Sequence, residues 1–75
     1  MNELYTITEI QVLSNGAVAS QTFDRTSWND ALNVYYSSLA AGAINGIPYH
    51  ATYLIDSRRG VRMSNIYDRR VTENG

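Results

Sequence analysis

The chain has 75 residues, 44% of them hydrophobic, and its six basic residues against seven carboxylates give a net charge of −1. This length predicts a single domain, residues 1–75, and the absence of cysteine excludes disulfides and thiolate metal sites. No apolar run approaches the ~20 residues of a membrane helix, and no basic segment followed by an apolar run marks a secretory signal. We therefore expect a protein of the cytoplasm that does not enter a membrane.

A β-hairpin is predicted first. Residues 3–13 (ELYTITEIQVL) are rich in Tyr, Thr, Ile and Val, which is the composition of a strand. Asn15–Gly16 follows, and this dipeptide favours a tight turn because both residues tolerate positive φ. Residues 17–23 should therefore form a second strand that runs antiparallel to the first.

The alternation of the first strand changes phase half-way. Tyr5 and Ile7 share one face, whereas Ile10 and Val12 fall on the other. A bulge near Thr8–Glu9 would bring the two halves onto one face. Alternatively, both faces of the sheet are covered, one by a helix and one by another subunit.

A helix is predicted next, because apolar residues recur at steps of three and four. Thr26 or Ser27 would cap its start, Asn45–Gly46 would end it, and Pro48 forbids its continuation. The apolar stripe comprises Trp28, Ala31, Leu32, Tyr35, Leu39, Ala43 and Ile44. The outer face carries Asn29, Asn33, Ser37 and Ser38.

A second hairpin is predicted over residues 49–55 and 61–68, joined by a turn at DSRRG. In its last strand, alternation places Val61, Met63 and Tyr67 on one face and Arg62, Ser64 and Ile66 on the other. Residues 69–75 are predicted to be a flexible tail, which leaves an ordered core of about 3–68.

The predicted order is therefore β-β-α-β-β, an α+β fold with a four-stranded antiparallel sheet and one helix packed on one face. Apolar side chains point to both faces of the strands, and one helix covers only one face. If the second face stays exposed to water, the folded state lacks about 25 cal/mol of stabilising free energy for each Å² of apolar surface that is left unburied. We expect a homo-oligomer that buries this face or an edge strand, against the alternative of an exposed face with scattered apolar residues.

The sequence gives no catalytic or metal-binding pattern. His50 is the single histidine, and a lone histidine on a strand is more often structural than a catalytic base. There is no nucleophile elbow, phosphate loop or zinc-protease motif, and the carboxylates lack the spacing of metal ligands. We therefore expect a protein that is not an enzyme and needs no cofactor.

Five of the six arginines lie between residues 58 and 70. Arg58, Arg59 and Arg62 around one turn could hold phosphates bidentately, and Tyr67 could line the same pocket, which predicts capture of a nucleotide. Binding of nucleic acid is disfavoured because the chain is net acidic and carboxylates lie beside the arginines. Alternatively, the arginines are solvated residues that block pairing at a strand edge.

The outer face of the predicted helix could bind a protein partner through Asn29, Asn33, Tyr36 and Ser37. Tyrosine offers a large contact area with a polar tip, which suits interfaces. Gly42 lies within a run of small residues and costs about 1 kcal/mol against alanine inside a helix. That cost would be explained if the backbone of a partner packed against it.

The sequence resembles short uncharacterised proteins encoded by tailed phages and prophages of gut bacteria. The resemblance rests on the strand Tyr5–Gln11, on Gly16, on Phe23 before the helix, and on the junction Ile44–His50. It implies an accessory protein that binds and blocks a component of a bacterial defence system in the cytoplasm of the host cell. A structural component of the phage is the remaining alternative.

Overall fold

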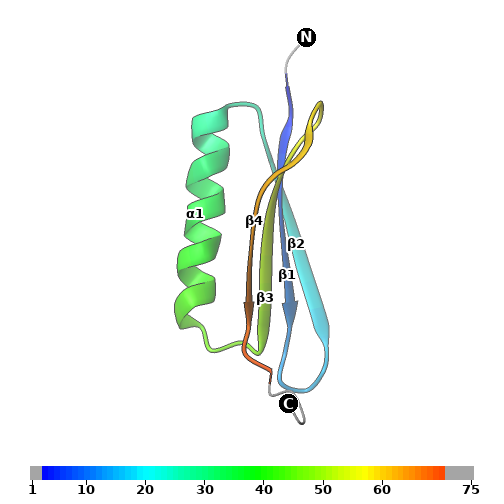
Figure 1. Cartoon of the computed structure of the whole chain (residues 1–75), viewed down its shortest axis with the longest axis vertical. Coiled ribbons are helices and arrows are strands. Elements are labelled where there is room, and N and C mark those ends of the chain that lie inside the picture. The colour runs from blue at the N-terminus through cyan, green and yellow to red at the C-terminus, as the bar shows by residue number, and fades with distance from the viewer. Residues whose placement is uncertain (1–2, 71–75) are drawn as a thin grey trace.

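The structure, a computed structural model, describes residues 3–70. It contains β1 (Tyr5–Val12), β2 (Val18–Arg25), α1 (Trp28–Ile44), β3 (Tyr49–Asp56) and β4 (Gly60–Asp68). The strands form one sheet in the order β2-β1-β3-β4, every neighbouring pair is antiparallel, and α1 lies across one face (Figure 1). The predicted α+β fold and its β-β-α-β-β order are confirmed.

The β1–β2 hairpin turns where the sequence predicts. Gly16 adopts a φ of 88°, and the Asn15 side chain accepts a hydrogen bond from the backbone N–H of Ala17 at 2.9 Å. Asparagine and glycine suit this turn because each tolerates the backbone conformations it requires. β2 extends two residues further than expected, to Arg25.

The bulge predicted near Thr8–Glu9 is wrong. Pairing of β1 with β2 runs without interruption from Tyr5 opposite Arg25 to Val12 opposite Val18. β1 changes phase because Glu9 occupies a position on the helix-facing side of the sheet, where an apolar residue was expected. It is only 9% exposed there. Ile10 and Val12 consequently face the opposite side, since side chains alternate along a strand.

The irregularity of the sheet lies instead in the second hairpin. Leu54 pairs with Met63 while Ile55 pairs with Val61, so Arg62 is an extra residue in β4. The predicted grouping of Val61 with Met63 is therefore wrong, because Val61 lies opposite a residue of the other face. The guanidinium of Arg62 lies 5.3 Å from the centre of the Trp28 ring, on the helix side.

Both ends of α1 are capped. Ser27 is the N-cap and its hydroxyl accepts from the backbone N–H of Asp30, as the sequence predicts. At the other end Gly46 adopts a φ of 71°, the conformation that favours glycine after a helix. Arg69 donates to the carbonyl oxygens of Gly42 at 2.6 Å and Ala43 at 3.2 Å. A cation at this position complements the negative end of the helix dipole.

The helix buries a different stripe from the predicted one in its last two turns. Ala31 and Tyr35 are buried as expected, but the stripe continues through Ser38 and Gly42. Ile44 is 85% exposed. The assignment of Ser38 to the outer face and of Ala43 and Ile44 to the core is therefore wrong. The cause is a polar surface on the sheet beneath this half of the helix.

The apolar core fills the other half of the layer between helix and sheet. It consists of Tyr5, Ile7, Ala31, Tyr35 and Leu54. Trp28 closes this end, with its ring 5.5 Å from that of Tyr5 in an edge-to-face arrangement. Among residues 3–70 no helix has both the length and the apolar character that crossing a membrane requires.

Candidate functional site

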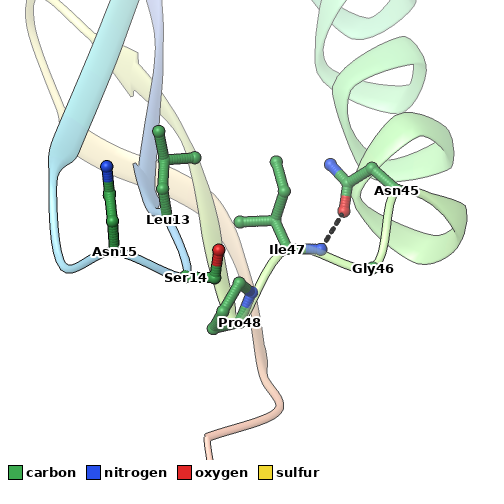
Figure 2. A pocket seen from close by; sticks show the side chains of 7 residues that line it. All are labelled: Leu13, Ser14, Asn15, Asn45, Gly46, Ile47 and Pro48. Atoms are coloured by element: carbon green, nitrogen blue, oxygen red, sulfur yellow. Dashed lines mark hydrogen bonds between the residues drawn. The ribbon is translucent and has the colours of Figure 1, made fainter.

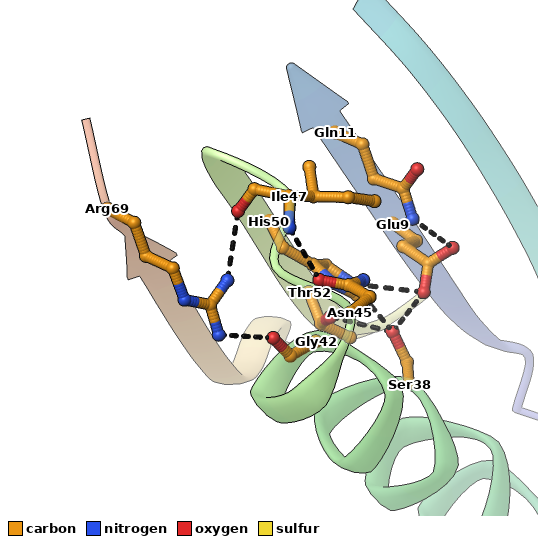
Figure 3. A network of polar contacts seen from close by, with 9 residues as sticks. All are labelled: Glu9, Gln11, Ser38, Gly42, Asn45, Ile47, His50, Thr52 and Arg69. Carbon is orange, nitrogen blue, oxygen red and sulfur yellow. Dashed lines mark hydrogen bonds and ion pairs between the residues drawn. The ribbon is translucent and has the colours of Figure 1, made fainter. Parts of the chain in front are cut away.

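A buried polar cluster connects the helix to the two central strands (Figure 3). Glu9 on β1 lies opposite Thr52 on β3, and Ser38 of α1 reaches down to both. The Ser38 hydroxyl donates to Glu9 Oε2 at 2.5 Å and lies 2.8 Å from Thr52 Oγ1. His50 Nε2 is 3.0 Å from the same Glu9 oxygen. Every buried side-chain nitrogen and oxygen of the described residues has a hydrogen-bond partner.

The hydrogen bonds assign the protonation of the His50 ring. Asn45 Oδ1 accepts from the backbone N–H of Ile47, so the Asn45 amide group donates to His50 Nδ1 at 3.2 Å. Nδ1 is then an acceptor, and Nε2 carries the proton that is donated to Glu9. Both nitrogens of the ring are therefore engaged inside the protein, where the ring is 1% exposed.

This arrangement does not activate Ser38 as a nucleophile. In a catalytic triad, histidine takes the serine proton at one nitrogen and donates to the acid from the other. Here Ser38 and Glu9 approach the same nitrogen of His50, and that nitrogen already bears a proton. Ser38 is also only 7% exposed. We interpret the cluster as structural.

Gly42 packs directly on this cluster. A methyl group added at its Cα would lie 2.5 Å from His50 Nδ1, a distance that real side chains do not tolerate. The interpretation of Gly42 as a contact for the backbone of a partner is therefore wrong. Its lack of a side chain is explained by the imidazole ring of the same chain.

Two open pockets adjoin the helix. The larger, of about 470 Å³, lies between the β1–β2 turn and the loop that joins α1 to β3 (Figure 2). It is lined by Leu13, Ser14, Asn15, Asn45, Gly46, Ile47 and Pro48, none of which is charged. The smaller, of about 210 Å³, is lined by Glu9, Phe23, Val34, Ser37, Ser38 and Ala41. The side-chain oxygen of Asn15 and both ends of the Asn45 amide are already used by local backbone and ring contacts.

The four residues predicted to bind a nucleotide are not brought together within one chain. Arg58 and Arg59 lie in the β3–β4 turn, and Arg62 follows on β4. Tyr67 lies opposite His50 near the other end of β4, five residues or about 17 Å from Arg62 at ~3.3 Å per residue. The guanidinium of Arg69 lies 5.4 Å from the centre of the Tyr67 ring.

A carboxylate occupies the centre of the arginine turn. Asp56 is 2% exposed and accepts from the backbone N–H of Arg58 at 2.8 Å and from Arg62 at 3.4 Å. The first of these hydrogen bonds, with the charge of Arg59, lowers the pKa of Asp56 below its usual 3.8. Asp56 therefore carries a negative charge at neutral pH and offsets the attraction of this turn for an anion.

The four residues predicted to bind a protein partner do share one surface. Asn29, Asn33, Tyr36 and Ser37 are all exposed, and their spacing places them along one side of α1. Tyr36 is 53% exposed, and its ring packs edge-on against that of Tyr35, with centroids 5.4 Å apart. We call these four residues the outer helix face. It combines an anchored aromatic ring with neutral polar groups.

No protein-family model, no curated protein and no solved structure matches this chain. The resemblance to phage proteins therefore stays a prediction.

Proposed function

We propose that this protein is a non-enzymatic binding protein that covers the surface of a partner protein with the outer helix face. The observation that carries the proposal is the position of Tyr36, which stands exposed among Asn29, Asn33 and Ser37 on a helix capped at both ends. Tyrosine is enriched among the residues that dominate binding energy. A capped helix that packs on a sheet holds such a group in place before binding, so little conformational entropy is lost.

The polar groups of the outer helix face indicate what kind of partner surface it would bind. Amide and hydroxyl groups can both donate and accept, and they are less costly to desolvate than charges. The face therefore suits a protein surface with exposed backbone groups and a recess for one aromatic ring. The resemblance to phage proteins supports a host defence protein as this partner, blocked by occlusion of its surface.

Capture of a nucleotide by Arg58, Arg59, Arg62 and Tyr67 is the weaker alternative. Asp56 lies among these arginines, and the extended length of β4 separates Tyr67 from them. Such a pocket would need a second chain to bring Tyr67 to the turn.

The proposal is tested by recovering the tagged protein from bacterial cells and quantifying what is bound to it. The variant Asn33→Arg/Tyr36→Ala should lose a specific protein partner by more than about tenfold, since loss of a dominant aromatic contact costs about 2 kcal/mol or more. The matched control Arg58→Ala/Arg59→Ala should keep it. Loss of a bound nucleotide from the control, with no effect of the helix variant, would overturn the proposal. Recovery in virions with neither effect would also overturn it.

A further inference from the structure

The face of the sheet opposite α1 is not covered by any element within residues 3–70. Side-chain alternation from the register assigns Ile10 of β1, Ala51, Tyr53 and Ile55 of β3, and Ile66 of β4 to this open face. Ile10, Ala51 and Ile66 lie in one row across three strands. Within this row Ile66 is 48% exposed, whereas Ala51 is buried by its neighbours.

Charge is confined to two corners of the open face. Of its strand positions only Asp24 and Asp68 are charged. Asp24 lies on edge strand β2 at the end marked by Thr6, and Asp68 lies on edge strand β4 at the end marked by Tyr49. The two aspartates therefore occupy diagonally opposite corners, and the strand positions between them are neutral. At one of these corners Arg70 bonds Asp68 and lies over the ring of Tyr49.

We propose that two copies of this chain pack against each other through the open face, which goes beyond the proposed partner binding. Four strands spaced at ~4.8 Å and eight residues at ~3.3 Å define a surface of about 19 by 26 Å, or about 500 Å². Two copies would then bury about 1,000 Å² in total. This is a lower bound, because side chains add surface to a flat sheet, and it meets the minimum of about 1,000 Å² for a specific interface. Sheets commonly pack face to face in this way, about 10 Å apart.

A two-fold axis can pair the open face with itself without bringing like charges together. An axis in the plane of the interface that runs along the strands exchanges the two edges of the sheet, and an axis across the strands exchanges its two ends. Neither operation brings Asp24 or Asp68 opposite an aspartate of the second copy, so no like-charge repulsion opposes the pairing. Both place the two copies of α1 on the outside, where the dimer presents two outer helix faces.

The test is the mass of the purified protein in solution, by sedimentation or native mass spectrometry at micromolar concentration. The wild-type chain should have twice the chain mass, and its thermal midpoint should rise with protein concentration. Ile66→Glu should give a folded monomer, because this side chain is half exposed in the single chain and would be buried in the dimer. Circular dichroism checks that the variant is folded.

The matched control is Ile44→Glu. It adds the same charge at an isoleucine that is 85% exposed at the end of α1, away from the open face, and should remain a dimer. A wild-type monomer with a concentration-independent midpoint would overturn the proposal. An Ile66→Glu dimer, or a monomer produced only by Ile44→Glu, would also overturn it. If Ile66→Glu does not fold, the concentration dependence of the wild-type midpoint decides alone.

Discussion

Single residues in the layer between helix and sheet have roles that follow from contacts with distant parts of the chain. Glu9 illustrates this best, because its carboxylate accepts from Ser38, 29 positions along the chain, and contacts His50, 41 positions along it. A carboxylate buried in an antiparallel sheet is costly unless it is hydrogen-bonded, and these two partners supply that compensation. The same cluster explains why the helix turns a serine and a glycine inward.

Replacement of Gly42 by alanine should destabilise the protein. At an open helical position this change stabilises by about 1 kcal/mol. Here the added methyl group would lie 2.5 Å from His50 Nδ1. Because the ring is held on both sides by hydrogen bonds, we expect the free energy of unfolding to fall by roughly 1–3 kcal/mol, measured by urea denaturation. A stability above that of the wild type would contradict the contact. Ala40→Gly, on the exposed side of the helix, measures the propensity effect alone.

We expect Arg70 to control the pKa of Asp68. Hydrogen bonds from the side chain and backbone N–H of Arg70 lower the pKa of Asp68 from 3.8 to about 2. A carboxyl group whose pKa is lower in the folded than in the unfolded state stabilises the folded protein. This contribution is complete above the unfolded pKa and is lost as the pH falls through the folded pKa. We expect Arg70→Ala to raise the pKa of Asp68 toward 3.8 in an NMR titration of the carboxyl carbon. An unchanged pKa would contradict the pairing.

At the scale of elements, the C-terminal end of α1 depends on a residue that follows the last strand. Of the predicted tail, residues 69–75, the structure describes Arg69 and Arg70, and residues 71–75 lie outside the described part of the chain. Arg69 bonds the carbonyl oxygens of Gly42 and Ala43, and also that of Ile47 at 2.9 Å. It therefore joins β4 to the end of the helix and to the loop before β3.

Arg69→Ala should fray the last turn of α1. The substitution leaves helix carbonyls without a cationic donor and removes a favourable interaction with the dipole, for a loss of roughly 1–2 kcal/mol. Hydrogen exchange of the backbone N–H of Asn45, which donates to the carbonyl of Ala41, should become faster while exchange near Ala31 stays unchanged. Arg70→Ala is the matched control, since its guanidinium bonds Asp68 and lies over the Tyr49 ring. Equal exchange in the two variants would contradict the capping role.

At the scale of the whole molecule, the strands differ in how many neighbouring strands they pair with and in how much of their surface is buried. The described chain measures 49 by 20 by 18 Å and is therefore elongated. β1 and β3 are central and pair on both sides, whereas β2 is an edge strand with most of its residues exposed. Stability is therefore expected to vary across the sheet.

Hydrogen exchange in the native protein should follow this order. Amides of β3 should exchange most slowly, because this strand pairs on both sides and contributes Leu54 and His50 to the buried layer. Amides of β2 that point away from β1 should exchange fastest among those of the four strands. Uniform protection of β2 and β3 would contradict the expectation and indicate that the edge of β2 is covered in solution.

The sequence alone predicted the elements and their order because their ends carry local signals. Asn15–Gly16 marks the first turn, Ser27 starts the helix, and Asn45–Gly46 ends it. Each signal depends on the φ that a residue tolerates or on a hydrogen bond to a neighbour a few positions away. The outer helix face could also be predicted from the sequence, because the spacing of its residues places them on one side of a helix.

The tertiary structure decided which side chains are buried, because those contacts join residues far apart in the chain. Composition gave no reason to place Glu9 and Ser38 inside, since carboxylates and serines are usually exposed. Only the register of β1 with β3 brings Glu9, Thr52 and His50 under the second half of α1, and this contact selects the helix stripe through Ser38 and Gly42. The same register gathers apolar side chains on the open face and separates Tyr67 from the arginine turn. Local propensity cannot supply these relations, because strand pairing is specified by contacts between whole elements.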